Sequence, residues 1–184
     1  MNHHNMKYLL GMLLLAAPLM VLAGGTTSRE YLLSGHGNLA LQVPSGWRDQ
    51  VKRPAKRMPP TITFSPKSGN LFQVIVTPIW SHRKDHKLPS GRKIRPLVES
   101  SIQDISRQAV EQSISPREIT GKQGGGYYFS ATSKSPKPGD FKYLSQGMIR
   151  IGDLLTTFTI LSKDGAEKDV QSALAMFRGA RQIK

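Results

Sequence analysis

A pair of histidines with an aspartate between them is the pattern closest to a metal site in this chain: His82, Asp85 and His86. On a helix, a spacing of four would place both imidazoles on one face, as a metal ion requires. However, the segment has the composition of a loop, and several cations surround the histidines. Positive charge disfavours a divalent ion, and no further ligands can be located. We therefore interpret both histidines as surface residues and expect no metal.

Patterns that would support catalysis are also missing from the sequence. No serine lies in a Gly-x-Ser-x-Gly elbow. The run Gly124-Gly125-Gly126 lacks the Gly-Lys-Ser/Thr ending of a phosphate-binding loop and precedes a strand pattern, so we expect a mobile hairpin turn there. His36 lies in a turn-like Ser-Gly-His-Gly segment. With no cysteine, thiol catalysis and thiolate metal sites are excluded. We expect no catalytic residue and no cofactor.

Basic residues are the strongest chemical signal, and they gather in two segments. The formal net charge is +14, from 26 Lys and Arg against 12 Asp and Glu. Segment 48–57 reads RDQVKRPAKR and segment 82–95 reads HRKDHKLPSGRKIR, each with a single acid. Because both contain Pro or Gly, we expect both to be loops. The candidate anion-binding residues are Arg48, Lys52, Arg53, Lys56, Arg57, Arg83, Lys84, Lys87, Arg92, Lys93 and Arg95.

Two interpretations of this charge remain open. The segments could face an anionic envelope component, such as lipid headgroups, lipopolysaccharide or acidic glycans, or an acidic protein. They could equally form a solvated surface that only improves solubility. Nucleic acid is not expected, because no nucleic-acid-binding motif is present. Trp47 and Trp80 border the basic segments and could touch a membrane or a sugar, but we favour a role in anchoring the ends of the segments to the core.

The N-terminal residues have the features of an export signal. A polar start with one lysine is followed by an apolar run over residues 8–22, which ends in Val21-Leu22-Ala23. A signal peptidase accepts small residues at the third and first positions before the cut, here Val21 and Ala23. We therefore expect cleavage after Ala23 and a periplasmic or secreted product. An uncleaved membrane anchor is the alternative, but the run contains Pro18 and is shorter than the roughly 20 residues that span a bilayer. Residues 24–184 would then form a single domain.

Apolar periodicity predicts strands in both halves of that domain. Residues 38–43 alternate in hydrophobicity, and two β-branched runs, 61–65 and 71–77, flank a Pro/Gly/Asn turn typical of a hairpin. Further strands are expected at 118–123, 125–133, 142–151 and 154–161, with a tight turn at Gly152-Asp153.

Two helices complete the expected elements. Pro96 suits a first helical turn, and the stripe Val98, Ile102, Ile105 and Ala109 predicts a helix to about Gln112. A second helix is expected after a capping box formed by Asp164 and Glu167, with Arg178, Arg181 and Lys184 at its C-terminal end. The predicted class is α+β, with one antiparallel sheet of about six or seven strands sandwiched by helices.

The order of these pieces resembles the PsbP-like family, which is named for an extrinsic protein of photosystem II and includes bacterial DcrB-like envelope proteins. The residues that carry the resemblance are Val43-Pro44-Ser45-Gly46-Trp47, TITFSP, LFQVIVTPI, Gly126-Tyr127-Tyr128 and the Phe158 strand. The resemblance covers about Gly35 to Arg181. It implies an α/β/α sandwich and a non-enzymatic accessory role, but no binding residue of the family can be matched here.

These observations lead to a functional expectation with alternatives. We expect a non-enzymatic, exported accessory or binding protein that docks to an anionic partner through segments 48–57 and 82–95. The alternative is a carrier of a small molecule or lipid in a pocket between sheet and helices. A third possibility, an enzyme acting on an envelope polymer, lacks a clustered base and nucleophile.

Overall fold

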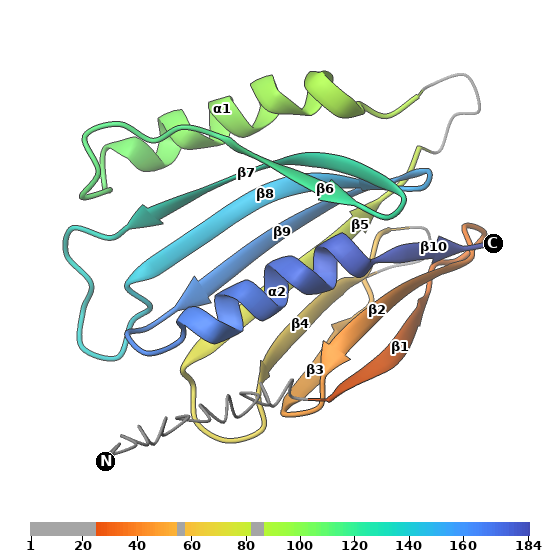
Figure 1. Cartoon of the computed structure of the whole chain (residues 1–184), viewed down its shortest axis with the longest axis horizontal. Coiled ribbons are helices and arrows are strands. Elements are labelled where there is room, and N and C mark those ends of the chain that lie inside the picture. The colour runs from red at the N-terminus through yellow and green to blue at the C-terminus, as the bar shows by residue number, and fades with distance from the viewer. Residues whose placement is uncertain (1–24, 55–57, 82–86) are drawn as a thin grey trace, which may run out of the picture.

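A computed structural model describes residues 25–54, 58–81 and 87–184 (Figure 1). The predicted export signal, His82 and His86 lie outside these residues. Within the described part of the chain, no helix is both long and apolar enough to cross a membrane. Among the same residues, no group of three or more His, Cys, Asp or Glu side chains is placed to hold a metal ion.

The described residues form ten strands in two antiparallel sheets, together with two α-helices and a short 3₁₀ helix, which confirms the α+β class. The prediction of a single sheet is therefore wrong, because a second, three-stranded sheet accompanies the large one. A seven-stranded sheet has the order β3-β4-β5-β9-β8-β7-β6, and a three-stranded sheet has the order β1-β2-β10. The elements are β1 Thr26–Leu32, β2 Asn38–Pro44, β3 Trp47–Lys52, β4 Thr61–Pro66, β5 Phe72–Ile79, η1 Gly91–Ile94, α1 Arg95–Ser106, β6 Arg117–Gly121, β7 Gly124–Thr132, β8 Tyr143–Ile151, β9 Leu154–Ser162, α2 Glu167–Gly179 and β10 Arg181–Ile183.

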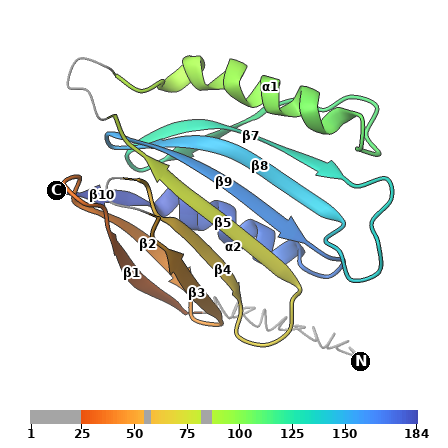
Figure 2. The ribbon, with the colours of Figure 1, turned by 180° about the vertical axis from the view of Figure 1, so that it is seen from behind.

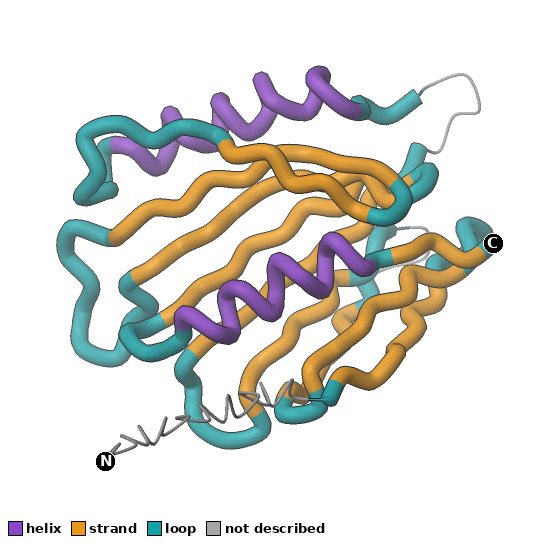
Figure 3. The backbone as a smooth tube through the Cα atoms, in the orientation of Figure 1, coloured by secondary structure: helices purple, strands orange, loops and turns teal. Residues whose placement is uncertain are grey.

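The two faces of the seven-stranded sheet are covered differently. Figures 1 and 2 show α1 along one margin of the sheet, whereas α2 lies along the opposite face, roughly in the direction of the strands. Figure 3 shows the three-stranded sheet on the same side as α2. Strand alternation divides the apolar side chains accordingly, because successive residues point to opposite faces. Phe129 and Leu155 pack with α1, and Phe158 and Ile160 pack with α2 and the small sheet.

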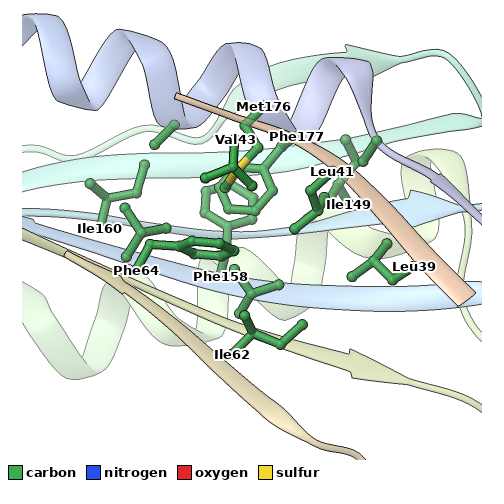
Figure 4. Packing of buried hydrophobic residues seen from close by; sticks show 14 of the residues in the cluster. Leu39, Leu41, Val43, Ile62, Phe64, Ile149, Phe158, Ile160, Met176 and Phe177 are labelled. Carbon is green, nitrogen blue, oxygen red and sulfur yellow. The ribbon is translucent and has the colours of Figure 1, made fainter. Parts of the chain in front are cut away.

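The larger core lies between the seven-stranded sheet, α2 and β2 (Figure 4). Phe158 of β9 stacks on Phe177 of α2, with ring centroids 4.3 Å apart and an interplanar angle of 23°. Leu39, Leu41 and Val43 of β2 are fully buried in the same cluster. The small sheet is therefore an integral layer of the domain.

Both tryptophans anchor chain segments to this core, as we favoured from the sequence. Trp47 is 3% exposed, and its Nε1 donates to Asp169 Oδ1 of α2 over 3.1 Å. Trp80 is 5% exposed and stacks on His36 at 4.7 Å between ring centroids. Neither indole is available for insertion into a membrane.

The first helix is shorter than predicted, ending at Ser106 instead of near Gln112. The chain beyond it turns and then pairs with β7, because backbone bonds to β7 replace helical ones. Val110 N donates to Thr132 O over 2.8 Å, and Glu111 accepts from the backbone N–H of Thr132 over 2.9 Å. The apolar stripe continues through Ala109 because that residue is buried beside β7.

The predicted boundaries of the second helix are also wrong. Asp164 does not cap it, because its carboxylate accepts from Tyr143 Oη at 2.6 Å and Lys142 Nζ at 3.1 Å. The helix begins at Glu167 and ends at Gly179. Arg181 consequently lies in β10, and Lys184 pairs with Asp153 at 2.6 Å.

The glycine run at 124–126 was expected to form a hairpin turn, but all three residues belong to β7. The turn is made by Lys122 and Gln123 instead. A Cβ on Gly126 would lie 2.7 Å from the Cα of Ile149 in β8, closer than two such atoms can approach. The glycine therefore permits close contact between neighbouring strands.

Gln182 of β10 ties the C-terminus to three turns. Its Nε2 donates to His36 O over 2.8 Å, and its Oε1 accepts from Asp153 N over 2.7 Å. The side chain of Gln123 bonds the backbone N–H and carbonyl of Gln182. With 8% exposure, Gln182 satisfies buried polar groups that would otherwise lack partners.

We expect the substitution Gln182→Ala to lower the free energy of unfolding by about 2 kcal/mol, because two hydrogen bonds are lost and their partners remain partly buried. Gln42→Ala is a matched control, since Gln42 is an exposed residue of β2 in the same sheet. Chemical denaturation of both variants would measure the difference. Equal losses in the two variants would show that the Gln182 contacts contribute nothing.

Candidate functional site

The first basic segment begins as a strand, which corrects the prediction of a loop over 48–57. In β3, Arg48, Gln50 and Lys52 alternate with Trp47, Asp49 and Val51. Trp47 and Val51 contribute to the larger core, so the three basic or amide side chains point to the other side, where α1 lies. Arg48 and Lys52 are both exposed.

Asp49, the one acid of this segment, is turned away from its basic neighbours. Its carboxylate accepts hydrogen bonds from the guanidinium of Arg29 and from Tyr31 Oη, the latter over 2.8 Å. Burial raises the pKa of the Tyr31 hydroxyl, and the Asp49 carboxylate raises it further, so Tyr31 stays a neutral donor. The counter-charge of the segment is therefore neutralised on the opposite side of the strand.

Strands β3, β4, β5 and β9 present a surface on the α1 side that we call the open face. Direct cross-strand pairs place its members on one side, for example Lys52 with Thr61, Gln50 with Thr63, and Ile75 with Thr159. All are half-buried or exposed, and among the described residues of these strands no carboxylate shares this side. Its members are Arg48, Gln50, Lys52, Thr61, Thr63, Ser65, Gln73, Ile75, Thr77, Thr157, Thr159 and Leu161.

A hollow of about 410 Å³ lies at the end of the open face where β3 begins, and we call it the Arg48 hollow. The Nε of Arg48 donates to Ser65 Oγ over 3.0 Å, which fixes the guanidinium at the rim. Phe141 forms part of the wall, and the ammonium of Lys163 lies 5.6 Å from its ring centroid. The lining side chains include Arg48, Gln50, Thr63, Ser65, Asn70, Gln73 and Phe141, and Asp49 also borders the hollow.

In the described part of the second basic segment, residues 87–90 form a loop as predicted, whereas residues 91–95 are helical, which corrects the prediction there. Arg92 and Lys93 are exposed residues of η1, and Lys87 is exposed just before it. Arg95 begins α1, and its Nε donates to Glu99 Oε1 over 2.8 Å. This hydrogen bond and the charge of Glu99 raise the pKa of Arg95. The negative charge of Glu99 also offsets part of the positive charge that Arg95 would offer to an anionic partner.

The structure brings some predicted residues together and separates others. Lys52 and Arg53 lie at the end of the sheet where β5 ends, and α1 starts over the same end (Figure 1). η1 packs against β7 and β8, about 20 Å from β3 at the ordinary strand spacing. Arg48 is about 13 Å from Lys52 along β3. Lys56, Arg57, Arg83 and Lys84 lie outside the described residues.

Sequence reasoning missed the hydroxyl and amide side chains of the open face. The signal was available, since polar residues alternate with apolar ones at 61–65, and Gln73 and Thr77 share one parity in the run 72–77. Period-two alternation shows that such residues share a side, but it does not show whether a helix covers that side. Phe141, in the loop before β8, carries no pattern that links it to β3.

A second pocket of about 320 Å³ lies beside the first turns of α2, against β7, β8 and β9. Ser130 Oγ and Ser145 Oγ share a hydrogen bond of 2.8 Å in its wall. Glu111 also lines it, and although burial opposes ionisation, the bonds from Thr132 hold the pKa of this carboxyl below its usual range. Its lining combines serine hydroxyls with aliphatic side chains and the charged residues Glu111, Lys163 and Glu167.

No protein-family model and no curated protein matches the chain. A solved structure with some similarity is a crystal structure of a protein from Bacteroides thetaiotaomicron VPI-5482, with a TM-score of 0.44 and 10% sequence identity. The alignment covers 88% of this chain and 49% of that one, so the chain spans about half the length of that protein. No residue role is transferred at this level of similarity.

Proposed function

We propose that this chain is a non-enzymatic, exported binding protein of the cell envelope that docks to an anionic partner. The observation that carries the proposal is the separation of charges on β3. Arg48 and Lys52 point to the open face, whereas the carboxylate of Asp49 is bound by Arg29 and Tyr31 on the opposite side. The partner would therefore meet cations whose neighbouring acid, Asp49, is already bound by Arg29 and Tyr31.

The surroundings of these cations support the same proposal. Hydroxyl and amide side chains adjoin them, and these can donate to carboxylate or phosphate oxygens. Arg53, Arg92 and Lys93 are exposed at the end of the sheet and would extend the positive potential. An ion pair at an exposed surface is individually weak, so the affinity would depend on several contacts.

The proposed location follows from the export signal. Cleavage after Ala23 would release residues 24–184 into the periplasm or the medium, where acidic glycans, lipid headgroups and acidic proteins occur. The finer resemblance to a PsbP-like sandwich remains part of this proposal. It is supported by helices on both sides of the large antiparallel sheet and by the buried positions of Trp47 and Phe158.

Charge reversal on β3 should weaken binding selectively. We expect the triple variant Arg48→Glu, Lys52→Glu, Arg53→Glu to bind an anionic target at least roughly tenfold more weakly at low salt, because each basic residue near an anionic surface contributes about 1 kcal/mol. The assay is a salt series with anionic vesicles, polygalacturonate and polyglutamate. The effect should diminish as salt screens the charges.

The matched control reverses Arg117, Lys122 and Arg181, which are exposed in and near β6 and β10. It changes the net charge by the same amount away from the open face. Equal loss in the two triple variants would mean that only net charge matters. No low-salt binding of the unchanged protein to any of these polyanions would overturn the proposed function.

A second candidate function, the carriage of a small molecule, is favoured by the pocket beside α2. Its volume of about 320 Å³ falls within the range of ligand sites. Native mass spectrometry of gently purified protein would detect a retained ligand. If Ser145→Phe removed such an adduct and left polyanion binding unchanged, the pocket would be a separate carrier site.

A further inference from the structure

Resting on the proposed function, we infer that the Arg48 hollow is a binding subsite for an acidic sugar residue, and that the anionic partner is a polysaccharide lying across the open face. Besides Asp49, whose carboxylate is bound by Arg29 and Tyr31, the hollow combines three kinds of group within about 410 Å³: a guanidinium, hydroxyl and amide side chains, and aromatic rings. A sugar that carries a carboxylate presents the complementary groups, namely an anion, several hydroxyls and a C–H face.

Arg48 is placed to take the acidic group. Its Nε is engaged by Ser65, so four of the five N–H donors of the guanidinium belong to its two terminal nitrogens. Those nitrogens form a planar fork that suits a carboxylate. Because Ser65 orients the fork in advance, less side-chain freedom is lost on binding.

The amides and hydroxyls supply partners for sugar hydroxyls. Gln50, Asn70 and Gln73 each offer both a carbonyl acceptor and an amino donor, and Thr63 can act in either role. These residues come from β3, β4, β5 and the turn between the last two. Side chains on strands are held more rigidly than those on loops, which favours a defined sugar orientation.

Phe141 supplies an apolar surface within this polar wall. The side chain is half-buried, and Lys163 lies 5.6 Å from its ring centroid. The C–H face of a sugar can pack against such a ring, while the ammonium adds a second positive charge nearby. This mixture distinguishes the hollow from a purely ionic patch.

A second, smaller hollow extends the site toward α1. Its volume is about 110 Å³, and it shares Phe141 with the Arg48 hollow. Leu161 and Leu144 line it from β9 and β8, and Gln108 lines it from the segment after α1. Register pairs Gln73 with Leu161 and Leu161 with Leu144, so the two hollows follow one line across the strands. From β3 to β7 this line is about 24 Å long, enough for several sugar units.

The composition of the open face favours a glycan over a membrane. None of the exposed large apolar side chains in the described residues, such as Leu32, Met58 and Ile183, belongs to the open face. Peripheral membrane binding combines basic charge with apolar groups that enter the bilayer. The open face offers the charge together with hydroxyls and amides.

The test separates sugar recognition from charge alone. We would measure binding of the protein to polygalacturonate, to neutral dextran, to polyglutamate and to phosphatidylcholine vesicles containing phosphatidylglycerol. The key variant is Gln73→Ala with Phe141→Ala, which leaves the net charge unchanged. We expect at least tenfold weaker binding to polygalacturonate and unchanged binding to polyglutamate and vesicles, with no binding of dextran. The β3 charge-reversal variant should lose binding to polygalacturonate, to polyglutamate and to the anionic vesicles.

Each outcome decides between the two proposals. If the Gln73→Ala, Phe141→Ala variant keeps full affinity for polygalacturonate while the β3 charge-reversal variant loses it, the proposed sugar subsite is wrong and the proposed docking to an anionic partner stands. If the unchanged protein binds no polyanion, both fail. Should the double variant not fold, amide chemical-shift mapping of the unchanged protein with oligogalacturonate decides instead. Shifts gathered at Arg48, Gln50, Ser65, Gln73 and Phe141 would support the subsite, and shifts confined to η1 would overturn it.

Discussion

The substitution Phe158→Ala is expected to lower the free energy of unfolding by about 3–5 kcal/mol, the usual cost of removing a buried phenylalanine ring. Phe158 is 1% exposed, near the middle of β9. Its ring stacks on Phe177 (Figure 4), with 4.3 Å between ring centroids. The ring centroid of Tyr128 lies 6.5 Å away. The substitution leaves a cavity where β9 meets α2.

Such a loss is a large fraction of the roughly 5–15 kcal/mol that stabilises a typical domain. Thermal and chemical denaturation of the variant would measure it, with Leu97→Ala as the control. Leu97 lies on α1 and is 39% exposed, so its truncation should cost less than about 1 kcal/mol. A cost for Phe158→Ala as small as that of the control would contradict the stacked contact between β9 and α2.

The substitution Gly126→Ala should destabilise the protein by about 3 kcal/mol or more, which is large for a single added methyl group. A Cβ at this position would overlap the carbonyl oxygen of Met148 and lie 2.8 Å from its carbonyl carbon. Both atoms belong to the backbone of β8, so no side-chain rotation relieves the clash. The pairing of β7 with β8 would have to open locally.

Gly46→Ala provides the control for this prediction. Gly46 lies in the turn between β2 and β3, and a Cβ there would have no neighbour within 4 Å. We expect the free energy of unfolding of the Gly46→Ala variant to differ from that of the unchanged protein by less than about 1 kcal/mol. The two variants can be compared by urea denaturation. A small effect at Gly126 would mean that β7 and β8 separate more readily than their register implies.

The strands of the large sheet were predictable because their patterns are local. Residues 61–65 and 157–160 alternate between apolar and polar, and β4 and β9 confirm the strands predicted around them. The turn at Gly152-Asp153 was likewise confirmed. Side chains on a half-buried strand alternate whatever the rest of the chain does, so a short window is sufficient.

The ends of the helices and the second sheet were not predictable in this way. β10 has three residues, and its strand conformation depends on pairing with β2, which lies about 140 positions earlier in the chain. The helical stripe after Ser106 continues to Ala109, yet the bonds of Val110 and Glu111 to Thr132 hold this segment against β7 outside the helix. Long-range hydrogen bonds override local helical periodicity at both places.

The sequence by itself determined the class, the main strands and the unequal distribution of charge, because composition and periodicity are local properties. Only the tertiary structure decided that Arg48 and Lys52 point away from Asp49, and that Phe141 meets Gln73 at one hollow. Those relations depend on strand register and on which side of the sheet each helix covers. Register is set by pairing between distant segments, and no spacing along the chain records it.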